Sequence, residues 1–187
     1  MEAPDRGQWE ELRAGDREAC ARFVGDQYAA LYRWLCRLTG RSDLAADLTQ
    51  GSFAAFWESL RRGLPGVAAR TWLFSIGRNQ WRKHCRDQAK RDRQETGALD
   101  RIAAPEGSAW SDAEREEFGA ALESAVGELS AEFREVFVLR LWHEFDYAEI
   151  AAIQRISADL ARWRFFRARQ QVRARLKAWE DAEETRT

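Results

Sequence analysis

Residues 150–169 read IAAIQRISADLARWRFFRAR, and this stretch says most about the fold. A short apolar segment ends near Gln154, and Ser157 stands where it can cap a second helix, rich in arginine and aromatic residues. Asp146 and Glu149, just before the segment, have the spacing of a capping box. Two helices joined by so few residues, the second long and basic, are typical of a helix-turn-helix. The stretch therefore predicts a helical domain in the second half of the chain.

The second of these helices has two different faces. An apolar stripe recurs at steps of four, three, four and four residues, which places it toward the core of its domain. The stripe comprises Ala161, Phe165, Ala168, Val172 and Leu176. The opposite face carries Asp159, Arg162, Trp163, Phe166 and Arg167 near the start of the helix, where a recognition helix touches base edges. For Trp163 and Phe166, DNA contact and docking against a neighbouring helix or partner protein are equal alternatives.

Length and composition limit the class of protein. The chain has 187 residues, enough for one modest domain or two small ones. Its 45% hydrophobic and 33% charged residues, with only three prolines, favour a soluble helical protein. No apolar run approaches the ~20 residues of a membrane span, and the first residues lack the apolar segment of a signal peptide. We therefore expect a cytoplasmic protein that does not contact a membrane.

The formal net charge of −1 conceals a strong segregation of charge. Residues 60–93 hold ten Lys or Arg against two Asp, and residues 155–177 hold eight bases against one acid. Between them, residues 95–135 hold eleven acids and three arginines. Two basic segments around an acidic one suit two separate contacts with a polyanion such as nucleic acid. The simpler alternative is that these are solvated helix faces.

Helical periodicity dominates the chain, and no convincing alternating strand is present. We expect an all-α fold of two small helical domains joined by a flexible linker. Residues 94–110 lose the periodicity and gain glycine, proline and small residues, which marks this linker. The predicted divisions are a helical domain at 1–93, the linker at 94–110, the helix-turn-helix domain at 111–179 and a polar tail at 180–187.

Five stretches in this order and spacing resemble the extracytoplasmic-function (ECF) class of bacterial RNA polymerase sigma factors. The resemblance runs from about Gly15 to Leu176. The stretches are GDREACARFVGDQYAALYRWLCRLTG, DLAADLTQGSFAAFW, RTWLFSIGRNQWRKH, LSAEFREVFVLRLWHEFDYAEIAAIQRIS and FRARQQVRARL. The resemblance implies a factor that binds core RNA polymerase, directs it to promoter DNA and melts the −10 region, with an anti-sigma factor as a further partner. It implies no covalent chemistry.

The resemblance also assigns residues to three contacts. Core polymerase would be bound by Asp47, Gln50, Phe53 and Trp57 on the second helix. Single-stranded −10 DNA would be held by Arg61, Arg62, Arg70, Asn79, Gln80, Lys83 and Arg86, with stacking and edge hydrogen bonds to an unstacked base. Duplex −35 DNA would be read by Arg155, Ser157, Asp159, Arg162, Trp163, Phe166 and Arg167.

Two departures from the family pattern matter. The family usually has an acidic residue after Gln50, whereas this chain has Gly51, which weakens a helix by about 1 kcal/mol relative to alanine. We hypothesise that phosphorylation of Thr49 or Ser52 by a protein kinase restores the lost charge and switches on polymerase binding. The turn of the helix-turn-helix usually holds glycine where Arg155 stands, so we expect a reshaped turn.

Three other functions are weaker alternatives. A sigma-like adaptor would bind polymerase or a regulator without reading promoters, and a helix-turn-helix repressor would bind duplex DNA without polymerase. An enzyme is the weakest alternative, because the chain has only two histidines and no glycine-rich phosphate loop. The three cysteines have no CxxC spacing. We therefore expect neither a metal site nor another cofactor.

Overall fold

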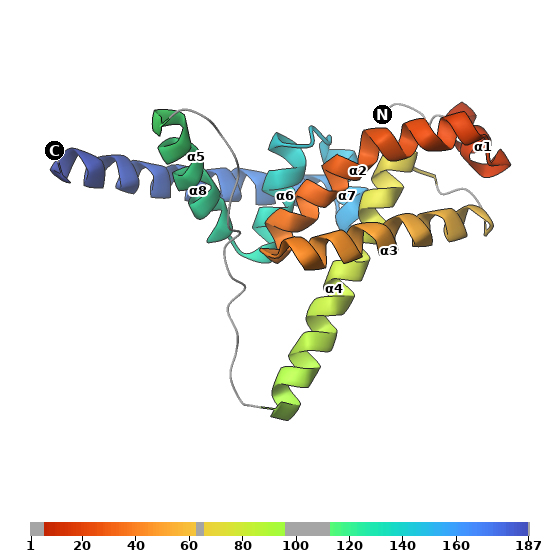
Figure 1. Ribbon diagram of the computed structural model, residues 1–187. Helices are drawn as coiled ribbons and strands as arrows, with labels where there is room; N and C mark the ends of the chain where they lie inside the picture. Colours follow the sequence, from red (N-terminus) through yellow and green to blue (C-terminus); the bar gives the residue numbers. More distant parts are fainter. Residues whose placement is uncertain (1–5, 63–65, 96–112, 187) are drawn as a thin grey trace.

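The computed structural model describes residues 6–62, 66–95 and 113–186, and all secondary structure in these ranges is helical (Figure 1). Four helices belong to the first half of the chain: α1 Arg6–Ala14, α2 Arg17–Thr39, α3 Ser42–Leu60 and α4 Ala69–Glu95. Four belong to the second: α5 Ala113–Gly127, α6 Ala131–Leu141, α7 Tyr147–Gln154 and α8 Ala158–Arg186. The all-α prediction is confirmed. In the described ranges no helix is both long and apolar enough to span a membrane.

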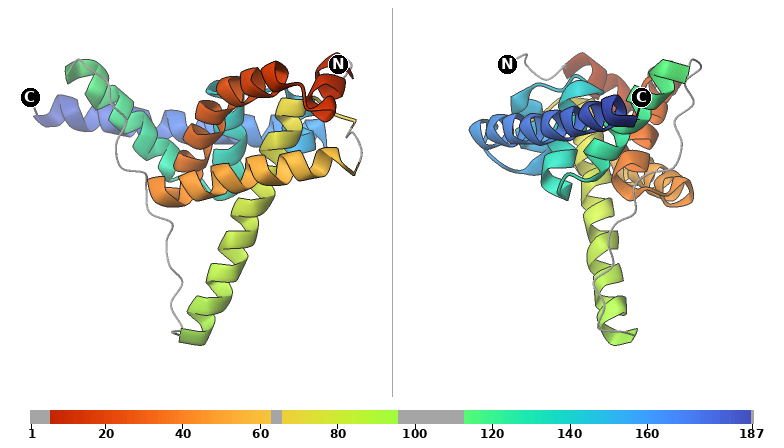
Figure 2. Two further views of the ribbon diagram at one scale, coloured as in Figure 1. Left: turned by 45° about the vertical axis from the view of Figure 1, so that its right-hand side comes forward. Right: turned by 90° about the vertical axis from the view of Figure 1, so that its left-hand side faces the viewer.

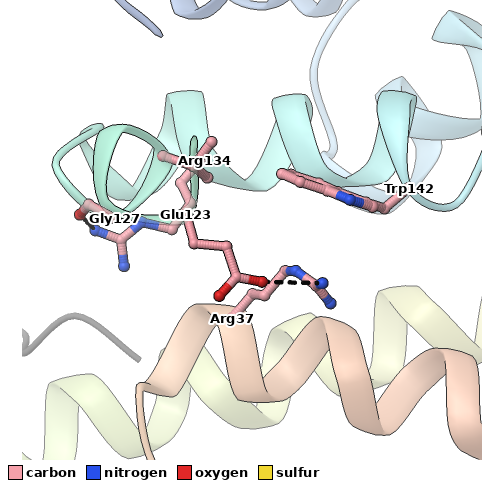
Figure 3. Close-up of a pocket in the computed structure, with 6 residues that line it drawn as sticks. Arg37, Glu123, Gly127, Arg134 and Trp142 are labelled. Carbon is pink, nitrogen blue, oxygen red and sulfur yellow. Dashed lines mark hydrogen bonds and ion pairs between the residues drawn. The ribbon is translucent and has the colours of Figure 1, made fainter. Parts of the chain in front are cut away.

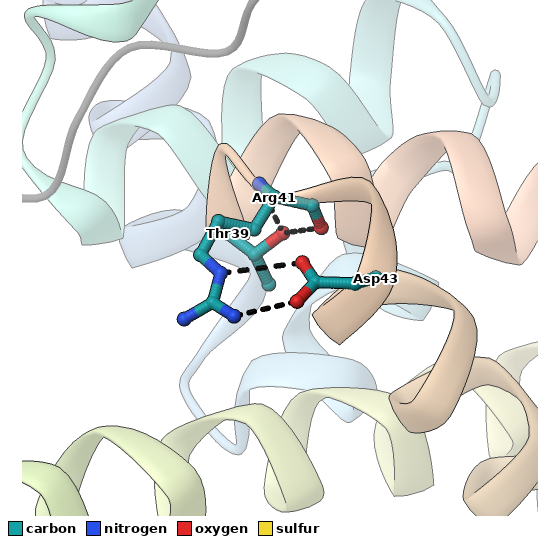
Figure 4. Close-up of polar contacts among 3 residues, drawn as sticks. All are labelled: Thr39, Arg41 and Asp43. Carbon is teal, nitrogen blue, oxygen red and sulfur yellow. Dashed lines mark hydrogen bonds and ion pairs between the residues drawn. The ribbon is translucent and has the colours of Figure 1, made fainter.

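The turn between α2 and α3 shows how local sequence ends one helix and starts the next. Gly40 adopts the left-handed conformation with φ 67°, and its N–H bonds the carbonyl of Cys36. The Thr39 hydroxyl accepts a hydrogen bond from the backbone N–H of Arg41. The guanidinium of Arg41 forms a salt bridge with the Asp43 carboxylate, with 2.6 Å between Nη2 and Oδ2 (Figure 4). These bonds fix the antiparallel approach of α2 and α3.

The first unit, α1 to α4, is built around an aromatic core. Phe23 of α2 stacks on Phe56 of α3 with ring centroids 5.0 Å apart, and Trp9 of α1 also stacks on Phe56, at 5.7 Å. The indole N–H of Trp9 donates to the carbonyl of Val67. Helix α4 approaches α2 and α3 closely at Gly77, where an added Cβ would lie 3.1 Å from Leu31 of α2 and 3.3 Å from Ser52 of α3. The large aromatics thus fill the space between these packed helices.

The second unit, α5 to α8, has a core that is mainly aliphatic. Its fully buried aliphatic residues are Val136, Val138, Leu139, Ile150, Ile153, Ala161 and Ala168, and Phe137 and Phe145 are buried with them. Three residues of the predicted stripe on α8, Ala161, Ala168 and Val172, are buried, and Phe165 and Leu176 are half-buried against the same core. The predicted core-facing stripe is confirmed.

The two units pack against each other, which the sequence did not indicate. Helix α4 of the first unit lies along α7 of the second in both views, while the second half of α4 projects from the body (Figures 1 and 2). Phe74 of α4 meets Phe145 edge-on with centroids 4.9 Å apart, so the apolar core continues from one unit into the other.

The helices α1 to α4 and α5 to α8 lie on either side of the predicted linker. Most of the predicted linker at 94–110 lies outside the described residues. Helix α8 continues to Arg186, so the predicted polar tail is helical up to that residue.

Candidate nucleic-acid interface

Helices α7 and α8 form a helix-turn-helix. Asp146 accepts the N–H of Glu149, and Glu149 accepts the N–H of Asp146, which confirms the predicted capping box. Arg155 in the turn has φ 56° and ψ 51°, so the arginine takes the left-handed conformation that glycine usually supplies. The expectation of a reshaped turn was therefore wrong. Ser157 accepts the N–H of Leu160 at 3.1 Å and caps α8 as predicted.

The outward face of α8 is formed by the residues predicted for duplex contact. Arg155, Ser157, Asp159, Arg162, Trp163, Phe166 and Arg167 are all exposed. Trp163 is 54% and Phe166 60% exposed, and the Trp163 ring also meets Phe133 of α6 at 6.0 Å. Arg162 lies over the Tyr147 ring at 5.5 Å and 3.8 Å from Asp159. Arg155 and Ser157 lie in the turn, and the other five residues follow within the first turns of α8.

Arg164 has a different role from its neighbours on α8. Its guanidinium bonds Glu132 at 2.8 Å and the side-chain oxygen of Gln154 at 3.2 Å, and only 13% of its side chain is exposed. It therefore holds the start of α8 against α6 and α7. Sequence analysis did not single it out, because spacing alone does not separate it from the exposed arginines on either side.

A buried polar network continues from Gln154 into the first unit. Gln154 donates to the Glu135 carboxylate at 2.9 Å, and Arg78 of α4 donates to the same oxygen at 2.5 Å. The side chains of Arg78 and Glu135 are 5% and 1% exposed. Burial raises the pKa of Glu135, and the charge of Arg78 opposes that rise. Arg78 is what allows a carboxylate to lie here.

Arg70, predicted to contact −10 DNA, takes part in the same seam between the units. It donates to the carbonyl of His143 at 2.6 Å and lies 4.2 Å from the centre of the Phe145 ring. Its neighbour Thr71 bonds Glu149 at 3.0 Å. Burial, with Arg70 and Arg37 nearby, lowers the pKa of His143 to about 3, so this histidine is neutral at physiological pH. In this arrangement Arg70 is half-buried and its guanidinium is engaged within the protein.

The other residues predicted for −10 DNA are accessible. Arg61 and Arg62 are exposed at the end of α3, where Arg62 pairs with Glu58 at 2.5 Å. Asn79, Lys83 and Arg86 are exposed along α4 at helical spacing, on one face. Gln80 is partly buried, and its side chain lies over Gly51 of α3.

The residues predicted for polymerase contact divide into two pairs. Asp47 and Gln50 are exposed on α3. Phe53 is only 7% exposed and stacks on Tyr28 at 6.0 Å, and Trp57 is partly buried against Phe23. Asp47 and Gln50 are thus available for a partner, whereas the two aromatics mainly support the helix.

Thr49 and Ser52, the hypothesised phosphorylation sites, are fully buried between α3 and its neighbours. Their hydroxyls donate to the carbonyls of Ala45 at 2.7 Å and Leu48 at 2.5 Å. Gly51 between them leaves room for Gln80, since an added Cβ would meet its Oε1 at 2.8 Å. The glycine at the family's acidic position thus serves the packing of α3 on α4.

A small hollow between α2, α5 and α6 belongs to the seam (Figure 3). Arg37 of α2 pairs with Glu123 of α5 at 3.5 Å and lies 4.9 Å from the centre of the Trp142 ring. Arg134, also in its lining, donates to the carbonyl of Leu129 at 3.1 Å. The hollow is thus lined by side chains that already pair within the protein. Within the described ranges no group of three or more His, Cys, Asp or Glu side chains could hold a metal ion.

Comparisons with known proteins match both units. Residues 23–91 match the family model for sigma-70 region 2, and residues 119–172 match that for sigma-70 region 4. The chain is 32% identical to the ECF RNA polymerase sigma factor SigL of Mycobacterium tuberculosis over 145 residues, 74% of this chain and 78% of the relative. It is 32% identical to the ECF sigma factor SigE of Mycolicibacterium smegmatis over 147 residues, 76% of this chain. The match spans just over half of SigE, 56%.

A solved structure extends the similarity to the arrangement of helices. CnrH in complex with the cytosolic domain of CnrY superimposes with a TM-score of 0.69 at 27% identity. The superposition covers 93% of this chain and 97% of CnrH. The match therefore includes both units.

Proposed function

Because the chain belongs to the family of ECF RNA polymerase sigma factors, we propose that it binds core RNA polymerase and directs it to promoters through two separate DNA contacts. The observation that carries the proposal is the helix-turn-helix of α7 and α8, whose basic, exposed face is free for the major groove. This face would read the −35 duplex. The proposed activity consists of binding core polymerase and positioning it at promoters, and it needs no covalent chemistry.

The exposed face of α4 would hold the melted −10 strand. Asn79, Lys83 and Arg86 offer amide and cationic groups along one side of the helix, and Arg61 and Arg62 lie at the end of α3. Cationic side chains follow a single-stranded backbone, and capture of unstacked bases favours melting. Arg70 would join this contact only after the seam between the units opens, because His143 and Phe145 hold it in the closed arrangement.

Core polymerase would contact α3 through Asp47 and Gln50, the two exposed polar residues at the predicted positions. An anti-sigma factor is a further partner, since the CnrH relative was solved with the cytosolic domain of CnrY. Such a partner would compete for surfaces needed for polymerase or DNA.

Phosphorylation of Thr49 or Ser52 would require α3 to separate from α4, because both hydroxyls are buried and bonded. A charge at either site would be taken out of water without a partner, which is costly. We therefore expect Thr49→Glu to lower the urea midpoint of unfolding rather than to raise affinity for core polymerase. A Thr49→Glu variant that folds normally and binds polymerase more tightly would restore the hypothesis.

The proposal is tested by in vitro transcription with bacterial core polymerase, using a pool of genomic fragments as template. The chain should bind the core enzyme and support initiation from a defined subset of fragments. An Arg167→Ala variant should still bind core polymerase but initiate poorly from the same fragments. Polymerase binding without initiation would favour the adaptor, and binding of duplex DNA without polymerase would favour the repressor.

A further inference from the structure

Two large aromatic side chains occupy the centre of the outward face of α8. Trp163 is 54% and Phe166 60% exposed, whereas the residues of α8 that face the core, among them Ala161 and Ala168, lie on another side of the helix. Exposing two rings to water forgoes the stabilisation that burial would give. Neighbouring exposed rings on one face are characteristic of a contact surface.

The arginines around these rings indicate what covers them. Successive residues of a helix are about 100° apart, so Arg162 and Arg173 lie along one side of the aromatic pair and Arg167 along the other. All three are exposed. The major groove has the matching layout, with phosphates along both walls and base edges on its floor. Asp159 on the same face lies 3.8 Å from Arg162, and the three arginines leave the face with a net positive charge. Charge complementarity therefore favours duplex DNA, rather than a protein, as the occupant.

We propose that Trp163 and Phe166 determine promoter specificity by packing against the C5-methyl groups of thymines in the major groove. The inference rests on the proposed function, in which α8 reads the −35 duplex. The phenyl ring has no hydrogen-bonding group and the indole has one donor, so neither can form the paired bonds by which arginine or asparagine reads a base. The thymine methyl is the apolar group on the floor of the groove.

The Trp163 ring has a neighbour on α6 that restricts its position. Trp163 meets Phe133 at 6.0 Å, and Arg164 beside it is fixed to Glu132 and Gln154. The helix start is further set by the Ser157 cap. A pre-ordered ring loses little conformational freedom on binding, so even a single methyl contact contributes to specificity.

The test uses the complex of this chain with core polymerase. A randomised double-stranded DNA library is selected for binding, and the selected duplex is resynthesised with deoxyuridine in place of one thymidine at a time, which removes only the methyl group. The wild type should bind about fourfold less tightly for each contacted methyl removed, the equivalent of about 0.8 kcal/mol for one buried methylene. The affinity of Trp163→Ala, and likewise that of Phe166→Ala, should no longer fall when deoxyuridine replaces thymidine at one position. Trp163→Phe should keep part of this loss of affinity.

Two variants serve as controls. Leu141→Ala removes an exposed apolar side chain on α6, 53% exposed, and should keep the full response to deoxyuridine. Arg167→Ala should weaken binding of thymidine and deoxyuridine duplexes equally. Equal affinity of the wild type for both duplexes, while Arg167→Ala still weakens binding, would overturn the methyl contact and leave the proposed function intact.

Two other results would also overturn the inference. Failure to select any duplex would remove the proposed function together with the methyl contact. Loss of core polymerase binding in the Trp163→Ala, Phe166→Ala double variant would show that this face contacts the enzyme instead of DNA.

Discussion

Helices α4 and α8 are both rich in arginine, yet the structure uses their arginines differently. In α4, Arg70 and Arg78 are turned into the seam between the two units and bond a carbonyl and a buried carboxylate. In α8, Arg162 and Arg167 are exposed beside two aromatic rings. Arg70 and Arg78 thus stabilise the contact between the two units, whereas Arg162 and Arg167 remain available to a partner. Charge density alone does not distinguish the two.

The sharpest test of this difference is Arg78→Met. Removing one partner of a buried pair leaves Glu135 without a compensating charge, which typically costs about 3 to 5 kcal/mol. We expect a loss of this size in the free energy of unfolding, measured by urea denaturation. The double variant Arg78→Met, Glu135→Met removes both charges and should recover most of the loss. A single variant as stable as the wild type would show that the pair does not hold the seam.

The same variant should have a changed pH dependence. Burial raises the pKa of Glu135, and removing the opposing charge of Arg78 should raise it further above the unfolded value of about 4.3. A raised carboxyl pKa gives stability that is present below the unfolded pKa and lost as pH rises through the folded pKa. The deficit of Arg78→Met relative to the wild type should therefore be smaller at about pH 5 than at about pH 8. An equal deficit at both values would contradict this account.

Arg164→Ala tests whether α8 also contains an arginine that stabilises the fold, as Arg70 and Arg78 do in α4. The variant removes the charged donor that bonds the buried Gln154. The free energy of unfolding should therefore fall by about 1 to 3 kcal/mol. The measurement is again the urea midpoint, with the adjacent Arg162→Ala as the matched exposed control. If both variants lose equal stability, burial is not what separates the two arginines.

Arg155→Gly probes an arginine that is exposed but held in an unfavourable backbone conformation. Glycine adopts a φ of 56° without steric cost, so the variant should gain about 1 kcal/mol in thermal unfolding experiments. If Arg155 also contacts phosphate as predicted, affinity for the selected duplex should fall at the same time. A loss of stability would show that the arginine side chain compensates for its backbone.

The smallest effect on folding is expected for Arg167→Ala. Its side chain is exposed and bonds only Gln170 among the described contacts, at 3.3 Å, so stability should change by no more than about 0.5 kcal/mol. The slope of log affinity against log salt should become shallower by about 0.9, the value for one lost phosphate contact. An unchanged salt slope would place Arg167 away from the DNA backbone.

Local patterns in the sequence predicted the helices and the helix-turn-helix correctly, because caps and apolar stripes act within a few turns. The Asp146 box, the Ser157 cap and the stripe from Ala161 to Val172 are examples. Contacts across long separations were missed. Arg78 and Glu135 are 57 residues apart, and neither residue's local spacing indicates its partner. For the same reason the sequence did not indicate that Arg70 bonds His143 across the seam, and Thr49 and Ser52 were treated as available hydroxyls although both are buried.

The carboxylate of Glu135 receives bonds from both sides of the seam, one from Arg78 and one from Gln154, the residue that also anchors Arg164 at the start of α8. Neither half of the chain can therefore lose its structure without removing a bond that the other needs. Heat should melt the free protein in a single cooperative transition, and amide hydrogens of α4 and α7 should exchange with solvent at similar rates. If the two units separated when the protein binds polymerase, one cooperative folding unit would become two.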